Sequence, residues 1–180
     1  MTEYNPWSDA RNRHDIIVGV TPLIDEQGWW LPADRVILIS ELQPAGVVRS
    51  AALAHQLAHV DLEGSFVVES AREGVANPSD IEAAARRLTS RRFLSLADIY
   101  DGIADTATLD GHELAAHLGV TPVVLADRIR YADDDEGAAI ADVARLVEWT
   151  DTVVERWACG QHLRPLSDPH VKARSMLMVA

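Results

Sequence analysis

Two histidines, His55 and His59, interrupt an apolar stretch whose hydrophobic residues recur at helical spacing between Ala45 and about Asp61. Helical residues four positions apart differ by about 40° in direction, so both imidazoles leave the same face and can bind one metal ion. Two surface histidines without a metal would have the same spacing. Buried imidazoles need polar partners, however, and the apolar neighbours supply none. The segment therefore predicts a metal-binding helix, and zinc suits a pair of histidine ligands.

Gln56 directly follows the first of these histidines. In zinc peptidases with the motif His-Glu-x-x-His, the glutamate at this position accepts a proton from the attacking water and delivers it to the leaving amine. A glutamine amide can hold a water by hydrogen bonding, but it has no basic oxygen at neutral pH. Gln56 therefore occupies the position of the general base without offering its chemistry.

The remaining patterns predict an α+β fold with a helical C-terminal portion. Short β-branched runs at residues 16–20 and 35–40, with a turn at 25–28 before an apolar segment at 29–31, predict a small antiparallel sheet on which the histidine helix packs. Residues 63–78 show no sustained period and predict a loop. Further helices are expected at residues 79–93, 96–104, 111–118, 123–131 and 138–159. We expect a metal-binding domain over 1–105, a helical portion over 106–160 and a loosely held tail over 161–180.

Charge and cysteine content restrict the partners and the compartment. The 180 residues carry a formal net charge of −12, which repels phosphate backbones, so direct nucleic-acid binding is not expected. Cys159 is the single cysteine and cannot form an intramolecular disulfide. The N-terminus lacks a basic and apolar leader, and no apolar run approaches membrane-spanning length. We therefore expect a cytoplasmic protein with no membrane partner.

The sequence resembles the ImmA/IrrE family of zinc metallopeptidases, which often come from phages and mobile elements. The resemblance rests on the order of the strand at 35–39, the helix segment at 53–59 and a later helix containing Glu82-x-x-Ala85. It extends through residues 91–96, which look like the corresponding run in actinobacterial members, and covers roughly residues 15–131. It implies a zincin-like fold, with a small antiparallel sheet packed on a metal-binding helix.

The resemblance also implies the ligands: His55, His59 and Glu82 would bind zinc, and Gln56 would stand where the family has its general-base glutamate. Glu82 has a second interpretation, because Ser79-x-x-Glu82 fits a capping box in which Glu82 reaches back to the helix N-terminus. Three other acidic residues compete for the role of third ligand: Glu69, Glu73 and Asp80.

The function implied by the resemblance is that of a zinc-dependent endopeptidase acting on a protein, with a helix-turn-helix repressor as the expected substrate. Gln56 predicts that the chain as written is inactive or attenuated. Gln56 in place of the family's glutamate has two explanations. It is an engineered substitution, which the intact ligand set favours, or it is natural, as in a non-catalytic zinc protein that docks a regulator. The substrate-binding residues are unknown from the sequence.

The helical portion suggests a second alternative, a DNA-binding regulator. Residues 114–129 have helix-turn-helix spacing, with Leu114, Leu118, Val120, Leu125 and Ile129 as the expected core. Its second helix offers only Arg128 and Arg130 to phosphates, so this alternative is the weaker one. His112 and His117 lie five positions apart, about 140° around a helix, and are expected on a solvated surface rather than at a metal.

Overall fold

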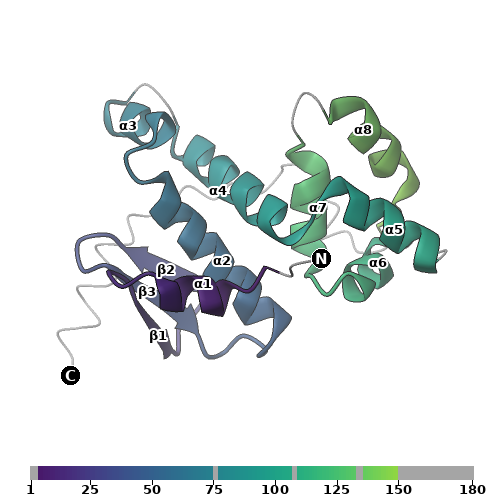
Figure 1. Cartoon of the computed structure of the whole chain (residues 1–180). Coiled ribbons are helices and arrows are strands. Elements are labelled where there is room, and N and C mark those ends of the chain that lie inside the picture. The colour runs from purple at the N-terminus through teal and green to yellow at the C-terminus, as the bar shows by residue number, and fades with distance from the viewer. Residues whose placement is uncertain (1–3, 75–76, 107–108, 133–135, 150–180) are drawn as a thin grey trace.

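The computed structural model describes residues 4–74, 77–106, 109–132 and 136–149. A three-stranded sheet lies with the helices Pro6–Asn12 and Val47–Leu62 in the N-terminal part, and the helix Pro78–Phe93 crosses the second of these and leads to a group of shorter helices (Figure 1). The elements in chain order are α1 (Pro6–Asn12), β1 (Ile17–Thr21), β2 (Gly28–Leu31), β3 (Val36–Ser40), α2 (Val47–Leu62), α3 (Phe66–Arg72), α4 (Pro78–Phe93), α5 (Leu96–Thr106), α6 (Gly111–His117), α7 (Pro122–Arg130) and α8 (Gly137–Leu146). The α+β class is as the sequence predicts.

The sheet is mixed, so the expectation of a wholly antiparallel sheet is wrong. Its strand order is β1-β3-β2, and the central strand β3 pairs parallel with β1 and antiparallel with β2. A tight turn with a positive φ of 54° at Arg35 reverses the chain between β2 and β3. β1 lies on the other side of β3 and runs in the same direction. Hydrophobic runs identify the strands but do not encode which neighbours pair.

Helix α2 packs its apolar side on this sheet. Ile37 and Ile39 are two residues apart, so their side chains lie on the same face of β3. Both are fully buried together with Leu53 and Leu57 of α2. Burial of side chains of this size stabilises the fold by about 1.5–3 kcal/mol each. The sheet therefore fixes the rotation of α2 about its own axis, which determines where its polar side chains point.

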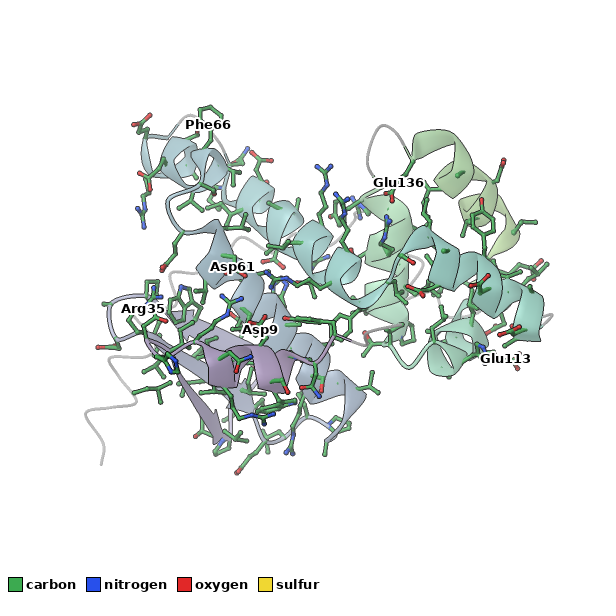
Figure 2. The ribbon with its side chains drawn as sticks, in the orientation of Figure 1. Asp9, Arg35, Asp61, Phe66, Glu113 and Glu136 are labelled. Carbon is green, nitrogen blue, oxygen red and sulfur yellow. The ribbon has the colours of Figure 1, made fainter. Side chains whose placement is uncertain are left out.

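The segment between α2 and α4 contains a helix, so the expected loop over residues 63–78 is wrong in part. Phe66 begins α3, and its side chain projects from the end of the molecule with 87% of its surface exposed (Figure 2). Helix α4 begins at Pro78, one residue after its cap Asn77, and the Asn77 N–H donates to the Asp80 carboxylate over 2.9 Å. The alternative interpretation of Glu82, a capping pair with Ser79, is therefore wrong.

The helices from α5 to α8 enclose a second core. Leu114, Val120 and Leu125 are buried there, and Leu118 and Ile129 pack against them, as the helix-turn-helix pattern predicts. This core also takes in residues 94 and 99, which precede the boundary expected near residue 105. Within the described parts of the chain, none of the helices is long and apolar enough to cross a membrane.

The last helix is shorter than the predicted 138–159. Helix α8 ends at Leu146, and Glu148 continues as extended backbone that accepts the Gly111 N–H over 2.7 Å. This pairing of backbone groups with the start of α6 replaces the helical hydrogen bonds that a longer α8 would form. The rest of the predicted helix, including Cys159, and the tail over 161–180 lie outside the described residues.

The buried side chain of Arg128 connects α7 with two other segments of the helical group. Its side chain is 2% exposed; its Nε donates to the Leu94 carbonyl over 2.9 Å, and its two terminal nitrogens donate to the Glu136 carboxylate over 2.9 and 2.6 Å. Glu136 lies beside the end of α7 in Figure 2. Both charges are thus paired, and Arg128 is not exposed for phosphate binding, contrary to the role that the DNA-binding alternative gave it.

Arg128→Ala should lower the free energy of unfolding by about 1–3 kcal/mol, because it removes the donor of the Leu94 carbonyl and the partner of the Glu136 carboxylate. Urea unfolding followed by circular dichroism measures the change. Arg130→Ala on the same helix is the control, since Arg130 is exposed and should cost less than about 1 kcal/mol. Equal losses in the two variants would contradict the internal role of Arg128.

Candidate metal centre

Helix α2 presents both histidines on the side away from the sheet, toward α4. The Nε2 atoms of His55 and His59 are 3.2 Å apart, and their rings meet edge to face. Their side chains are 22% and 21% exposed, so small molecules have access to them. The four-residue spacing places both histidines on one face of the helix. That face points away from the sheet because Leu53 and Leu57 hold the opposite face against it.

Helix α4 brings Glu82 to the same point. One carboxylate oxygen, Oε1, lies 3.2 Å from Nε2 of His55, and the other, Oε2, lies 3.4 Å from Nε2 of His59. Asn77 and Asp80 cap the N-terminus of α4, so the Glu82 carboxylate is not used as a cap. Its side chain points across to α2 instead.

Ligand atoms of the three side chains lie at separations close to those around a bound zinc ion. Zinc bonds of about 2.0–2.1 Å in tetrahedral geometry place neighbouring ligand atoms ~3.3 Å apart. The two imidazole nitrogens are 3.2 Å apart, and each has a different oxygen of Glu82 as its neighbour, Oε1 at 3.2 Å from His55 and Oε2 at 3.4 Å from His59. One ligand atom from each of the three residues lies within 4.8 Å of the other two. Two imidazoles and one carboxylate also form a common catalytic zinc ligand set that leaves a fourth position free. Among the described residues, His55, His59 and Glu82 are the group of this kind that could hold a metal ion.

The competing acidic residues lie outside this group. Glu69 accepts a hydrogen bond from Arg72 within α3 over 2.7 Å, and Asp80 accepts the backbone N–H of Asn77. Glu73 is exposed at the end of α3. None of the three belongs to the described group of converging ligand atoms.

Gln56 lies between the histidines and the sheet. Its side-chain Nε2 donates to the Gly28 carbonyl on β2 over 3.2 Å, and the residue is 9% exposed. Position 56 follows His55 by about 100° around the helix, which turns it toward the edge strand. The amide therefore joins α2 to β2, a contact that an ionised glutamate could not make because it has no donor.

The electrostatics of the site favour an ionised Glu82. Burial raises the pKa of Glu82, but the adjacent imidazoles of His55 and His59 outweigh burial and hold that pKa far below its usual range. Arg86, one turn further along α4, also donates from Nε to Glu82 Oε1 over 3.0 Å. A carboxylate that stays charged at neutral pH is the form in which it binds a metal.

Sequence reasoning missed Asp127, which α7 places beside this site. The residue is 6% exposed, and its Oδ1 is buried without a hydrogen-bond partner, 3.9 Å from Nη1 of Arg86. Burial raises the pKa of Asp127 to about 6, and the nearby Arg86 guanidinium is the main group that opposes this rise. The available signal was an acidic residue on the inner side of a predicted helix, but nothing in the sequence connects α7 with α2.

The two downstream histidines are apart from the site, as predicted, but only one is exposed. His117 is exposed and lies 4.0 Å from the Asp105 carboxylate. His112 packs against the Trp149 ring, and its Nε2 is buried without a hydrogen-bond partner, so its expected place on a solvated surface is wrong. Asp110 caps α6 by accepting the N–H groups of residues 112 and 113.

Asp127→Asn should stabilise the metal-free protein above pH 6 by about 1–3 kcal/mol. The folded-state pKa of about 6 exceeds the ordinary value of 3.8, so the contribution of Asp127 to stability is greatest below about pH 4 and is lost as pH rises through 6. Asparagine has no such charge to bury. Thermal melts of both proteins in chelator at pH 4.5 and pH 8 measure the difference, which should be large at pH 8 and small at pH 4.5. A difference independent of pH would contradict the raised pKa.

Protein-family models and curated protein sequences were both compared with the chain. No family model matches the chain, and no curated protein sequence matches it significantly. The resemblance to ImmA/IrrE metallopeptidases therefore stays a prediction, and the site is interpreted from its own geometry.

Proposed function

We propose that this chain is a zinc-binding protein of the metallopeptidase type, which engages a protein substrate at the site formed by His55, His59 and Glu82. The observation that carries the proposal is the convergence of two imidazole nitrogens 3.2 Å apart with a carboxylate, one oxygen of which lies 3.2 Å from His55 Nε2 and the other 3.4 Å from His59 Nε2. When bound, zinc supplies Lewis-acid chemistry: it polarises a peptide carbonyl and lowers the pKa of water. The three side chains would hold it, and their partial exposure leaves access for a substrate.

The chain's own residues decide how far hydrolysis can proceed. Glu82 is ionised but serves as a ligand, and Gln56 has no basic oxygen with which to accept a proton. General-base catalysis contributes on the order of 10²–10⁴ in rate. We therefore propose that the chain as written binds zinc and substrate but is inactive or strongly attenuated in peptide hydrolysis.

The finer features of the proposal follow the family resemblance. A small sheet packed on a ligand-bearing helix agrees with a zincin-like fold, although one strand pair here is parallel. The resemblance points to a helix-turn-helix repressor as the protein partner. A non-catalytic protein that docks such a regulator through the zinc site is the second candidate, and Gln56 in place of a glutamate favours it. The DNA-binding alternative is disfavoured by the burial of Arg128.

Metal analysis tests the centre of the proposal. Purified protein should carry close to one zinc per chain, and His59→Ala should lose it, because two remaining ligands do not hold the ion at micromolar zinc. Glu82→Gln should weaken zinc binding without loss of the α4 cap, which Asn77 and Asp80 supply. Elemental analysis gives the metal content, and melting with and without chelator gives its contribution to stability. A metal-free protein whose melting temperature does not change with zinc or chelator would overturn the proposal.

Gln56→Glu should convert the zinc protein into a peptidase. An ionised glutamate cannot donate to the Gly28 carbonyl, so the variant should lose about 1 kcal/mol of stability and free its carboxylate to accept a proton. Each form is incubated with a helix-turn-helix repressor encoded beside this chain and followed by gel electrophoresis and mass spectrometry.

The matched control for that experiment is Gln56→Glu combined with His59→Ala, which should cut nothing. Equal cleavage by the chain as written would show that Gln56 does not stand at the base position. Zinc-loaded Gln56→Glu protein that cuts nothing would favour the non-catalytic docking protein.

A further inference from the structure

Asp127 is a buried carboxylate whose position in the helical core has no structural explanation. Its side chain is 8% exposed, and its buried Oδ1 accepts no hydrogen bond. A buried carboxylate without hydrogen-bond partners disfavours folding. Such groups persist where the charge has another use.

The charged groups around Asp127 come from three helices and converge on the metal centre. Arg86 and Glu82 face it from α4, His55 from α2, and Arg130 from its own helix α7. α4 and α7 pack directly on each other. Asp127 therefore lies next to the ligands without being one of them, since its oxygen atoms are outside the group formed by His55, His59 and Glu82.

Arg86 connects Asp127 with the third ligand. Its Nε donates to Oε1 of Glu82 over 3.0 Å, while its Nη1 lies 3.9 Å from Oδ1 of Asp127. A guanidinium bound to a ligand oxygen competes with a metal cation for that oxygen, and it places a positive charge near the cation. A second carboxylate on the other side of the guanidinium offers it an alternative partner.

We propose that Asp127 is a positioning residue of the metal centre, which draws Arg86 away from Glu82 so that the Glu82 carboxylate can bind a metal cation. This inference rests on the proposed zinc site. When a cation arrives, Arg86 shifts the remaining distance toward Asp127 and forms a full ion pair there. The helical portion of the chain, through α7, thereby sets the metal affinity of ligands that belong to α2 and α4.

Asp127→Asn tests the proposal because it keeps the shape of the side chain and removes the charge. Zinc affinity is measured at pH 7.5 by competition with a chromophoric chelator of known affinity, using zinc alone as the probe. The variant should bind zinc about 10–100-fold more weakly, the usual loss when a group that supports a ligand is removed. Asp105→Asn is the matched control, since it removes the same charge from a side chain on α5 that is 72% exposed, and its affinity should stay within about twofold of the parent.

A double-substitution cycle identifies the route of the effect. If Asp127 acts through Arg86, then Asp127→Asn should cost less than about threefold in an Arg86→Met background, because no guanidinium remains to be redirected. The metal-free melting temperature of each variant establishes that it is folded. A residue with only a structural role would lower that temperature and leave the affinity of the folded protein unchanged.

The outcomes separate this inference from the proposed function. Unaltered zinc affinity in Asp127→Asn, with normal binding by the parent chain, overturns the role of Asp127 alone. An equal loss in both backgrounds of the cycle overturns the coupling through Arg86. A parent chain that binds no zinc removes the proposed site and this inference together.

Discussion

Helix α2 is packed on two sides, and the rest of the structure is arranged around that packing. Leu53 and Leu57 are buried with the β3 isoleucines on one side, and the two histidines meet α4 on the other. The apolar contacts fix the rotation of the helix, so the imidazoles have little freedom to turn away from Glu82. A metal centre needs ligands held in place before the ion binds, and core packing provides that rigidity.

Charges around the centre are kept at a cost to stability. Glu82, Arg86 and Asp127 are mostly buried side chains in one neighbourhood, and the Asp127 carboxylate is not fully paired. Arg128, only one residue further along α7, shows the contrasting case of a buried charge that is fully paired and holds the helices together. The comparison separates two uses of buried charge within one helix: Arg128 stabilises the fold, while Asp127 reduces stability and acts on the ligands.

Gln56 has two consequences that follow from one amide group. It lacks the basicity that hydrolysis requires, and it supplies the N–H that joins α2 to the Gly28 carbonyl. A glutamate at this position would exchange a contact with the sheet for a proton acceptor near the site. The amide therefore gives a firmer link between helix and sheet than a glutamate at this position would give.

The sequence alone located most of the local elements and the histidine pair, because both depend on periodicity along the chain, but it did not locate the short helices α1 and α3. Helical spacing in α2 put His55 and His59 on one face, and β-branched runs located β1 and β3. Local patterns did not predict features that depend on contacts with distant parts of the chain. These features are the direction of β1 relative to β3 and the end of α8, where the chain pairs with the start of α6. The burial of His112 and Arg128 depends on such contacts as well. The role of Glu82 was ambiguous for the same reason, since cap and ligand give one sequence pattern. Only the packing of α4 against α2 and α7 brought Glu82 to the histidines and Asp127 to Arg86, because residues so far apart in the chain become neighbours only when the two cores have formed.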